Sequence, residues 1–340
     1  MATTIHDVAN YLGVSVSTVS RCLNHHPDVS PEMQARVEAA FEKLDFVPSS
    51  AARNVSKKSA RTIGLTIPDI EDSYFARSAS GAEEIANQEG YTMFYGSLAR
   101  SPERMLRFVR NAREMRFDGI IITPDGWSDE LLEVIKKSGI PAVALRRRPP
   151  AESGIPYVDA DYYTGAEIMV DYLYKAGHRN IAHVVLDTAV GRERFRGYTD
   201  AMKARGLRPM PVQVDLPATR SVDGVKNGFA AAKLIREQYP QATAIFASTD
   251  PMAIGVKQYL QSVGLDCPRD ISLCGTGDTE YADLPCFALT TLAVDRYALG
   301  RCAAQLLFGM IKGTEPAPES VLLETQLIIR DSVSTVNREK

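Results

Sequence analysis

From Thr62 onward the chain alternates short apolar runs with amphipathic stretches, and this alternation most narrows the folds open to it. Seven runs rich in β-branched residues predict buried strands, at 62–68, 91–97, 119–123, 141–145, 180–186, 242–248 and 270–275. Helices are predicted between them, at 74–89, 101–116, 128–138, 161–176, 191–205, 222–238 and 251–263. A further helix is expected at 294–312 and a late strand at 320–329. Such alternation favours parallel sheets, and its length favours two α/β lobes over one sheet.

The first 47 residues have a different pattern of apolar residues, which predicts three short helices. Gly13 breaks the first helix, and Ser30 followed by Pro31 is a strong start for the third, as N-cap and first helical residue. Apolar residues at helical spacing mark one face of the first and third helices: Val8, Ala9, Leu12, and Val37, Ala40, Phe41, Leu44.

The stretch "VSVSTVSR", residues 14–21, has the residue preferences of a strand, but its surroundings predict a helix. Ser15 can cap a helix that begins just after the Gly13 turn, and Pro27 closes it. With Val19 and Leu23 on the buried face, four residues are expected on the opposite face: Val16, Ser17, Ser20 and Arg21. Two helices joined by a tight turn, with a third in support, are the layout of a helix-turn-helix. The alternative is a purely structural helix with a solvated arginine.

At this point the residues resemble a known family. The stretch from "IHDVANYLGVSVSTVSRCLNHH" to "SSAARNV" is similar to the N-terminus of the LacI/GalR family of bacterial transcription regulators. The resemblance continues through "RTIGLTIPDI", "GHRNIAHV", "RFRGYTDAM", "AIFASTDPMAIG" and "LTTLAVD" and covers nearly the whole chain. It implies an all-α helix-turn-helix headpiece followed by a two-lobed α/β domain like the periplasmic binding proteins, with a parallel sheet in each lobe.

The resemblance also implies the domain limits. The headpiece is expected at 1–47, a hinge helix or linker at 48–61, and an effector-binding and dimerisation domain at 62–340. Within that domain, the first lobe is expected at about 62–160 and 291–319, and the second at about 161–290 and 320–340.

In this family the second helix reads operator DNA, which implies a role for each residue that matches. Val16, Ser17 and Arg21 match positions that contact bases, where arginine suits guanine. Phosphate contacts are implied for Thr4, His6, Ser15, Thr18, Ser20 and Asn24. The implied partner is palindromic double-stranded operator DNA, bound by a homodimer because two half-sites need two headpieces.

The segment 48–61 reads by itself as a flexible linker, but the resemblance implies a hinge helix that enters the minor groove. The family's usual leucine wedge, which kinks the duplex, is replaced here by Val55, with Ala52 one turn earlier. Valine is shorter and a poorer helix former, so we expect a weaker hinge and a smaller bend.

The resemblance implies a small effector between the lobes. Phe75 matches a position that often stacks on the ligand, the alternative being core packing. Arg194 matches the arginine that binds effector hydroxyls or carboxylates. Thr249 stands where the family often has asparagine, and the next residue, Asp250, is expected to cap the following helix.

Two departures from the family pattern point to an anion. Gly277 replaces the first aspartate after the strand at 270–275, leaving Asp278 as a possible ligand, and Arg146 stands where an aspartate is common. With Arg194 nearby, the effector is expected to be a sugar or an anionic derivative, such as a sugar acid or sugar phosphate. The alternative is that Arg146–Arg148 form a solvated loop.

The other function classes find little support. No G-x-G-x-x-G after a strand, Walker A loop or G-x-S-x-G occurs, so an α/β enzyme is disfavoured and no cofactor is expected. Five cysteines without C-x-x-C, and five histidines without H-E-x-x-H, predict neither disulfides nor a metal site. A periplasmic binding protein would need an export signal in place of the headpiece. With no membrane-spanning run, a cytoplasmic, nucleoid-associated protein is expected.

Overall fold

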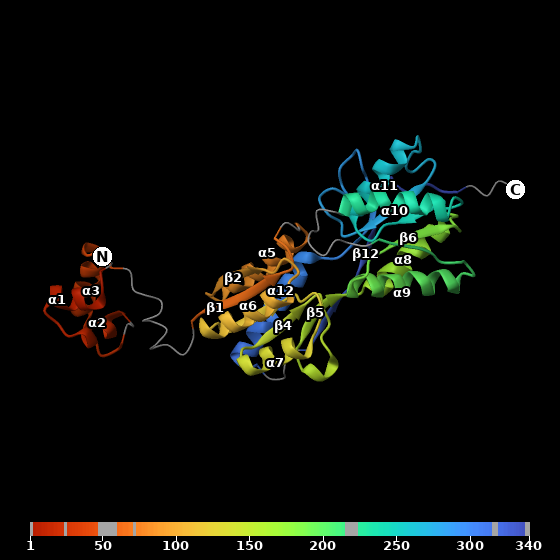
Figure 1. The fold of residues 1–340 in the computed structure, drawn as a ribbon. Coiled ribbons are helices and arrows are strands. Elements are labelled where there is room, and N and C mark those ends of the chain that lie inside the picture. The colour runs from red at the N-terminus through yellow and green to blue at the C-terminus, as the bar shows by residue number, and fades with distance from the viewer. Residues whose placement is uncertain are drawn as a thin grey trace. The chain divides into compact units, whose positions relative to one another are not determined.

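The structure is a computed structural model that describes residues 3–23, 26–46, 60–70, 73–214, 224–314 and 319–336. It comprises two compact units, residues 1–60 and 61–340, which are described separately here. Figure 1 shows the helices of the first unit in red and the two sheets of the second in orange to blue.

The first unit is a bundle of three helices, α1 (Ile5–Leu12), α2 (Val16–Leu23) and α3 (Pro31–Lys43), as the sequence predicts. Gly13 ends α1 in the left-handed conformation, with φ of 66°. The Ser15 hydroxyl accepts a hydrogen bond from the Thr18 amide, which confirms it as the cap of α2. The core consists of residues at most 2% exposed: Val8, Ala9, Val19, Cys22, Val37 and Ala40.

The buried face of α2 differs in detail from the prediction. Cys22, rather than Leu23, joins Val19 in the core, and Leu23 is only half-buried. Val16 is also half-buried and packs against this core, so it does not lie on the open face as expected. The reason is that α2 packs against both other helices, which places the i, i+3, i+6 stripe inward rather than an i, i+4 pair.

The second unit contains two six-stranded sheets, each covered on both faces by pairs of helices. The first sheet is parallel throughout, in the order β11-β5-β4-β3-β1-β2. Its strands are β1 (Thr62–Ile67), β2 (Thr92–Ser97), β3 (Gly119–Ile122), β4 (Ala142–Leu145), β5 (Tyr157–Ala160) and β11 (Val321–Leu323). Helices α5 (Ser73–Gln88) and α12 (Arg296–Lys312) pack together in one core, and α6 (Pro102–Glu114) and α7 (Asp129–Ser138) in another. A 3₁₀ turn, Ala151–Ser153, precedes β5.

The second sheet has the order β12-β10-β9-β8-β6-β7, and only β12 is antiparallel. Its strands are β6 (Ile181–Val185), β7 (Met210–Gln213), β8 (Ala244–Phe246), β9 (Ser272–Thr276), β10 (Thr290–Ala293) and β12 (Gln326–Ile328). Its helices are α8 (Tyr162–Lys175), α9 (Ala189–Ala204), α10 (Gly224–Gln238) and α11 (Asp250–Ser262). Figure 1 shows α10 and α11 on one side of this sheet and α8 and α9 on the other.

Three sequence predictions are wrong in the second unit. The strand expected at 320–329 is two strands, β11 and β12, one in each sheet. The strand expected at 91–97 is not buried, because β2 is a sheet edge on which Phe94 and Tyr95 are 45% and 43% exposed. Strands β5, β7 and β10 were not predicted as strands, because their four residues include polar residues or a proline and form no continuous apolar run.

The sheets also place the lobe limits differently near the C-terminus. The expected limits put residue 291 in the first lobe and residue 320 in the second. However, β10 belongs to the second sheet and β11 to the first. The chain therefore passes between the lobes at three places, after β5, after β10 and after β11, and we use "lobe" below for each sheet with its helices.

Among the described residues no helix is long and apolar enough to cross a membrane. The same part of the chain holds no group of three or more histidine, cysteine or acidic side chains that could bind a metal ion. All five cysteines are free thiols.

Candidate functional site

The open face of α2 carries short hydroxyl side chains and one arginine. Ser17 and Arg21 are exposed, while Val19 beneath them is fully buried. The Ser15 hydroxyl is hydrogen-bonded to those of Ser17, at 2.7 Å, and Thr18, at 2.8 Å. This gives a slim helix N-terminus with polar groups at its tip and a cation one turn further on, a shape that fits a DNA major groove.

The remaining headpiece residues that the sequence singles out lie around this helix or outside the described residues. Thr4 caps α1, and its hydroxyl donates to the Asp7 carboxylate at 2.6 Å, which holds the pKa of Asp7 below its usual value. His6 is exposed, whereas Thr18 and Ser20 are half-buried. The residues outside the described ranges are Asn24, Ala52 and Val55.

In the second unit, aromatic and arginine side chains gather where the two lobes meet. We call these six residues the interlobe cluster: Tyr74, Phe75, Arg146, Tyr162, Arg194 and Arg296. Arg146 follows β4 in a left-handed conformation, with φ of 61°. Its Nε donates to the Tyr162 hydroxyl at 3.1 Å, and its guanidinium carbon lies 4.1 Å from the Tyr74 ring centre and 5.0 Å from that of Phe75.

Arg194 approaches the same tyrosine from the second lobe. It is 4% exposed, and its Nη1 donates to the Ser248 carbonyl at 2.8 Å. Its guanidinium carbon lies 5.6 Å from the Tyr162 ring centre, and its Nε has no partner. The pKa of Arg194 is lowered to about 10, mainly by burial and also by the positive charge of Arg146, against the opposing effects of the two tyrosines and Asp250. Even so, the group is protonated at neutral pH.

The structure thus brings Phe75, Arg146 and Arg194 together, and it does so through a residue that the sequence analysis missed. Tyr162 is the first residue of α8, just after the chain leaves the first sheet, and it is buried. Burial raises the pKa of its hydroxyl, which therefore stays neutral. Tyr162 could have been recognised only from its position beside a crossing between the lobes, and that position is known only from the tertiary fold.

The run Arg146–Arg148 is not a uniformly solvated loop. The backbone carbonyl of Pro124 accepts from Arg147 Nε at 3.1 Å. Arg148, 45% exposed, pairs with the carboxylate of Asp159 at 3.7 Å. Of the three arginines, only Arg146 points into the interlobe cluster.

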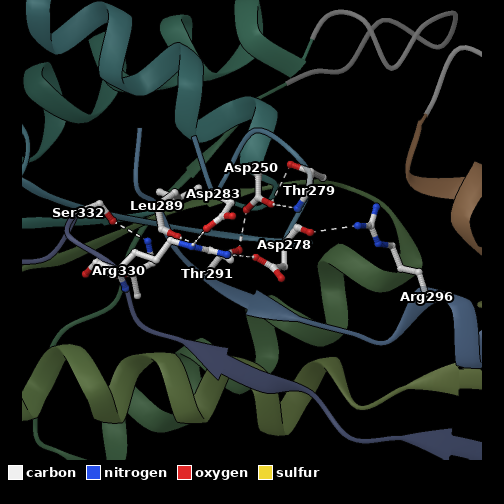
Figure 2. A network of polar contacts seen from close by, with 10 residues as sticks. Asp250, Asp278, Thr279, Asp283, Leu289, Thr291, Arg296, Arg330 and Ser332 are labelled. Atoms are coloured by element: carbon white, nitrogen blue, oxygen red, sulfur yellow. Dashed lines mark hydrogen bonds and ion pairs between the residues drawn. The ribbon is translucent and has the colours of Figure 1, made fainter. Parts of the chain in front are cut away.

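Thr249, and not Asp250 as expected, caps the helix that follows β8. Thr249 caps α11, because its hydroxyl accepts from the Met252 amide, so the capping role expected of Asp250 is wrong. The fully buried Asp250 carboxylate instead accepts from the amide and hydroxyl of Thr279 and from the hydroxyl of Thr291 (Figure 2). A carboxylate with this many internal donors fastens α11 to the loop that follows β9 and to β10.

Asp278 is also engaged within the protein. Its carboxylate accepts from Arg330 at 2.8 Å, and its backbone carbonyl accepts from Arg296 at 3.0 Å (Figure 2). Arg296 begins α12 of the first lobe, and its guanidinium carbon also lies 5.1 Å from the Tyr74 ring centre. Asp278 therefore anchors a contact between the lobes.

Comparisons with known proteins agree with this arrangement. Residues 4–49 match the family described as bacterial regulatory proteins, lacI family, and residues 170–333 match the periplasmic binding protein-like domain. Catabolite control protein A of Priestia megaterium is 32% identical over 310 residues, which cover 90% of this chain and 92% of that protein. The ribose operon repressor of Bacillus subtilis (strain 168) is 32% identical over 326 residues, which cover 94% of each.

Among solved structures, the lac repressor dimer bound to operator and the anti-inducer ONPF matches with a TM-score of 0.85 and 25% identity. The match covers 98% of this chain and all of that one. The family and the fold class expected from the sequence are confirmed. The chain belongs to the LacI family of bacterial regulatory proteins, with a helix-turn-helix DNA-binding domain followed by a two-lobed periplasmic-binding-protein-like domain.

Proposed function

We propose that this chain represses transcription by binding a palindromic operator as a homodimer, under the control of a small effector. The observation that carries the proposal is the open face of α2, where Ser17 and Arg21 are exposed above the buried Val19. A helix of this shape, set on a three-helix bundle, presents its N-terminal side chains to base edges. The related ribose operon repressor and the operator-bound lac repressor support the same role.

Within this proposal, each headpiece residue has a distinct role. Val16, Ser17 and Arg21 contact bases, and Val16 does so from the rim of the core. The phosphate contacts come from Thr4, His6, Ser15, Thr18, Ser20 and Asn24. Residues 48–61 form the hinge between headpiece and effector domain, where Ala52 and Val55 contact the minor groove.

The effector binds at the interlobe boundary, in contact with Phe75, Arg146 and Arg194. Thr249 and Asp278 border the same boundary, although the protein itself already uses their polar groups. A ligand that contacts both lobes changes their relative position, and operator and effector affinities are then coupled in both directions. The chain acts in the cytoplasm on the nucleoid and has no catalytic activity, a reading supported by relatives such as the ribose operon repressor.

Operator binding is tested by selecting duplexes from a random library with the full chain and measuring affinity against salt concentration. We expect a palindromic consensus, two chains per duplex, and a binding constant that falls steeply as salt rises. Selection of no consensus, or of a site bound by one chain, would contradict the proposal.

A further inference from the structure

Two arginines from different lobes share one tyrosine ring: Arg146, which is half-buried, and Arg194, which is 4% exposed. Arg146 follows β4 of the first lobe, and Arg194 lies in α9 of the second. Their guanidinium carbons are 6.0 and 5.6 Å from the Tyr162 ring centre. Like charges that are partly removed from water repel each other, and the charge of Arg146 lowers the pKa of Arg194, so a counter-charge would stabilise this arrangement.

The neighbouring carboxylates, Asp159 and Asp250, supply only part of that counter-charge, because neither pairs directly with Arg146 or Arg194. Asp159 lowers the potential around Arg146, but its carboxylate accepts from the Ala160 amide and pairs with Arg148. Asp250 lies near Arg194, yet its oxygens accept the three hydrogen bonds from threonines described above. Within the described part of the chain, neither Arg146 nor Arg194 forms an ion pair with a carboxylate within 4.0 Å. The nearby carboxylates of Asp159 and Asp278 pair instead with Arg148 and Arg330.

Unpartnered polar atoms mark where a ligand would bind. The Nε of Arg194 is buried without a hydrogen-bond partner, as is the hydroxyl of Thr276, the last residue of β9. Arg194 donates to Ser248, which follows β8, and β8 and β9 are neighbours in the sheet. Both atoms therefore lie at the carboxyl ends of adjacent strands, where open α/β sheets bind ligands, and buried polar groups rarely lack partners without a reason.

We propose that the effector is an oxyanion, a carboxylate or a phosphate, which binds between Arg146 and Arg194 and draws the two lobes together by its charge. This inference rests on the effector site proposed above. A planar guanidinium can offer an oxyanion two parallel hydrogen bonds, which neutral ligands match less well. Tyr162 acts as a positioning residue, since its hydroxyl accepts from Arg146 Nε and turns that guanidinium.

Thermal unfolding of the full chain tests the proposal with defined probes. Sodium phosphate, gluconate, glucose 6-phosphate and glucose are each titrated against sodium chloride of equal ionic strength. We expect at least one of the anions to raise Tm above the chloride control, and glucose to raise it less. Stabilisation by gluconate identifies the carboxylate as the ligand group, and stabilisation by phosphate or glucose 6-phosphate identifies the phosphate.

Arg146→Gln removes one of the two cations and is expected to weaken binding of the stabilising anion about tenfold or more. Arg148→Gln is the matched control, because it removes one positive charge from the same run outside the cluster, and anion binding is expected to be retained. Arg146→Lys and Tyr162→Phe cover the case in which Arg146→Gln does not fold. Both keep the charge of the site but loosen its geometry, so they are expected to bind the anion more weakly than the wild type.

The proposal is overturned if no anion stabilises the wild type beyond chloride, or if glucose stabilises it as much as gluconate and the Arg146 variants behave like Arg148→Gln. Operator affinity is measured on the same samples. Operator binding without an anion effect rejects only the oxyanion, whereas loss of operator binding by the wild type rejects the function on which it rests.

Discussion

The hydroxyl of Thr291 donates a 2.6 Å hydrogen bond to Oδ1 of Asp250, and so links the first residue of α11 to the middle of β10. The other oxygen of Asp250 accepts from the amide and hydroxyl of Thr279. Gly275 leaves room for this carboxylate, since a Cβ there would lie 2.4 Å from Oδ1. One side chain therefore holds together three segments of the second lobe.

Asp250→Ala is expected to lower the free energy of unfolding by about 2–4 kcal/mol, because it leaves three buried hydrogen-bond donors without an acceptor. Asp250→Asn is expected to cost about 1 kcal/mol or less. Its amide oxygen can still accept from Thr279, and its amide nitrogen can donate to the Thr291 hydroxyl. Urea unfolding of the two variants at neutral pH measures the difference, and equal losses would contradict this account.

His183 makes the second lobe sensitive to acid. It is fully buried beside Phe195, Tyr198 and Phe246, and its Nδ1 is hydrogen-bonded to the Phe246 carbonyl. Burial lowers the pKa of His183 to about 3 from 6.5, so the fold favours the neutral ring. The contribution of neutral His183 to the free energy of unfolding is complete above pH 6.5. It is lost as the pH falls from 6.5 towards 3, because the unfolded chain takes up a proton that the folded chain does not.

Between pH 6.5 and 5, this proton uptake is expected to cost the wild type about 2 kcal/mol. His183→Gln removes the titrating group and is expected to be less stable at pH 7 but to lose less on acidification. Urea unfolding at both pH values measures the two slopes. His178, whose pKa is also lowered by burial, remains in both proteins and cancels from the comparison.

Arg21→Ala is expected to weaken operator binding by roughly 1–3 kcal/mol and to relax base preference at one position in each half-site. Arg36→Ala is the control, since Arg36 is also an exposed arginine of the headpiece but lies on α3. Fluorescence anisotropy with the selected operator and its single-base variants measures both effects. A uniform loss across all base variants would reassign Arg21 to phosphate contact.

Val55→Leu is expected to increase the bend in operator DNA, because leucine makes a longer wedge and a better helix former. A circular-permutation gel assay with wild type and variant on one operator compares the bends. The wild type bending DNA as much as the variant would refute the idea of a weaker hinge.

Gly300→Ala is expected to destabilise the first lobe by about 1–3 kcal/mol or more, since α12 and α5 pack too closely for a side chain. A Cβ at Gly300 would lie 1.8 Å from the Ser78 carbonyl oxygen. Gly126→Ala is the control, because nothing lies within 4 Å of a Cβ there, and it is expected to change stability by less than about 1 kcal/mol. Thermal unfolding of the two variants distinguishes a packing effect from a general cost of replacing glycine.

The sequence predicts the elements with strong local signals and misses those defined by distant partners. The helix at 16–23 could be predicted despite its valines, since Gly13 and Ser15 mark its start. The late segment 320–329 could not be divided correctly, because β11 and β12 differ only in which sheet they join. Likewise, nothing local shows that β2 is an edge strand.

The same limit applies to the interlobe cluster. The family resemblance marks Phe75, Arg146 and Arg194, and the structure places them in contact with common partners. Tyr162 carries no local signal, because its role comes from a chain crossing that brings the first residue of α8 beside Arg146, the residue after β4. The choice between Thr249 and Asp250 as the cap of α11 was equally hidden, since either residue type can cap a helix and only the position of Thr279 and Thr291 decides between them.

Two residues of the interlobe cluster lie next to places where the chain crosses from one lobe to the other. Tyr162 follows the end of β5 by two residues, and Arg296 follows the end of β10 by three. Both side chains therefore lie next to the segments that join the two lobes. The oxyanion proposed above would act beside these joints, where a lever arm is short, so a small local shift would move the far end of a lobe by a larger distance.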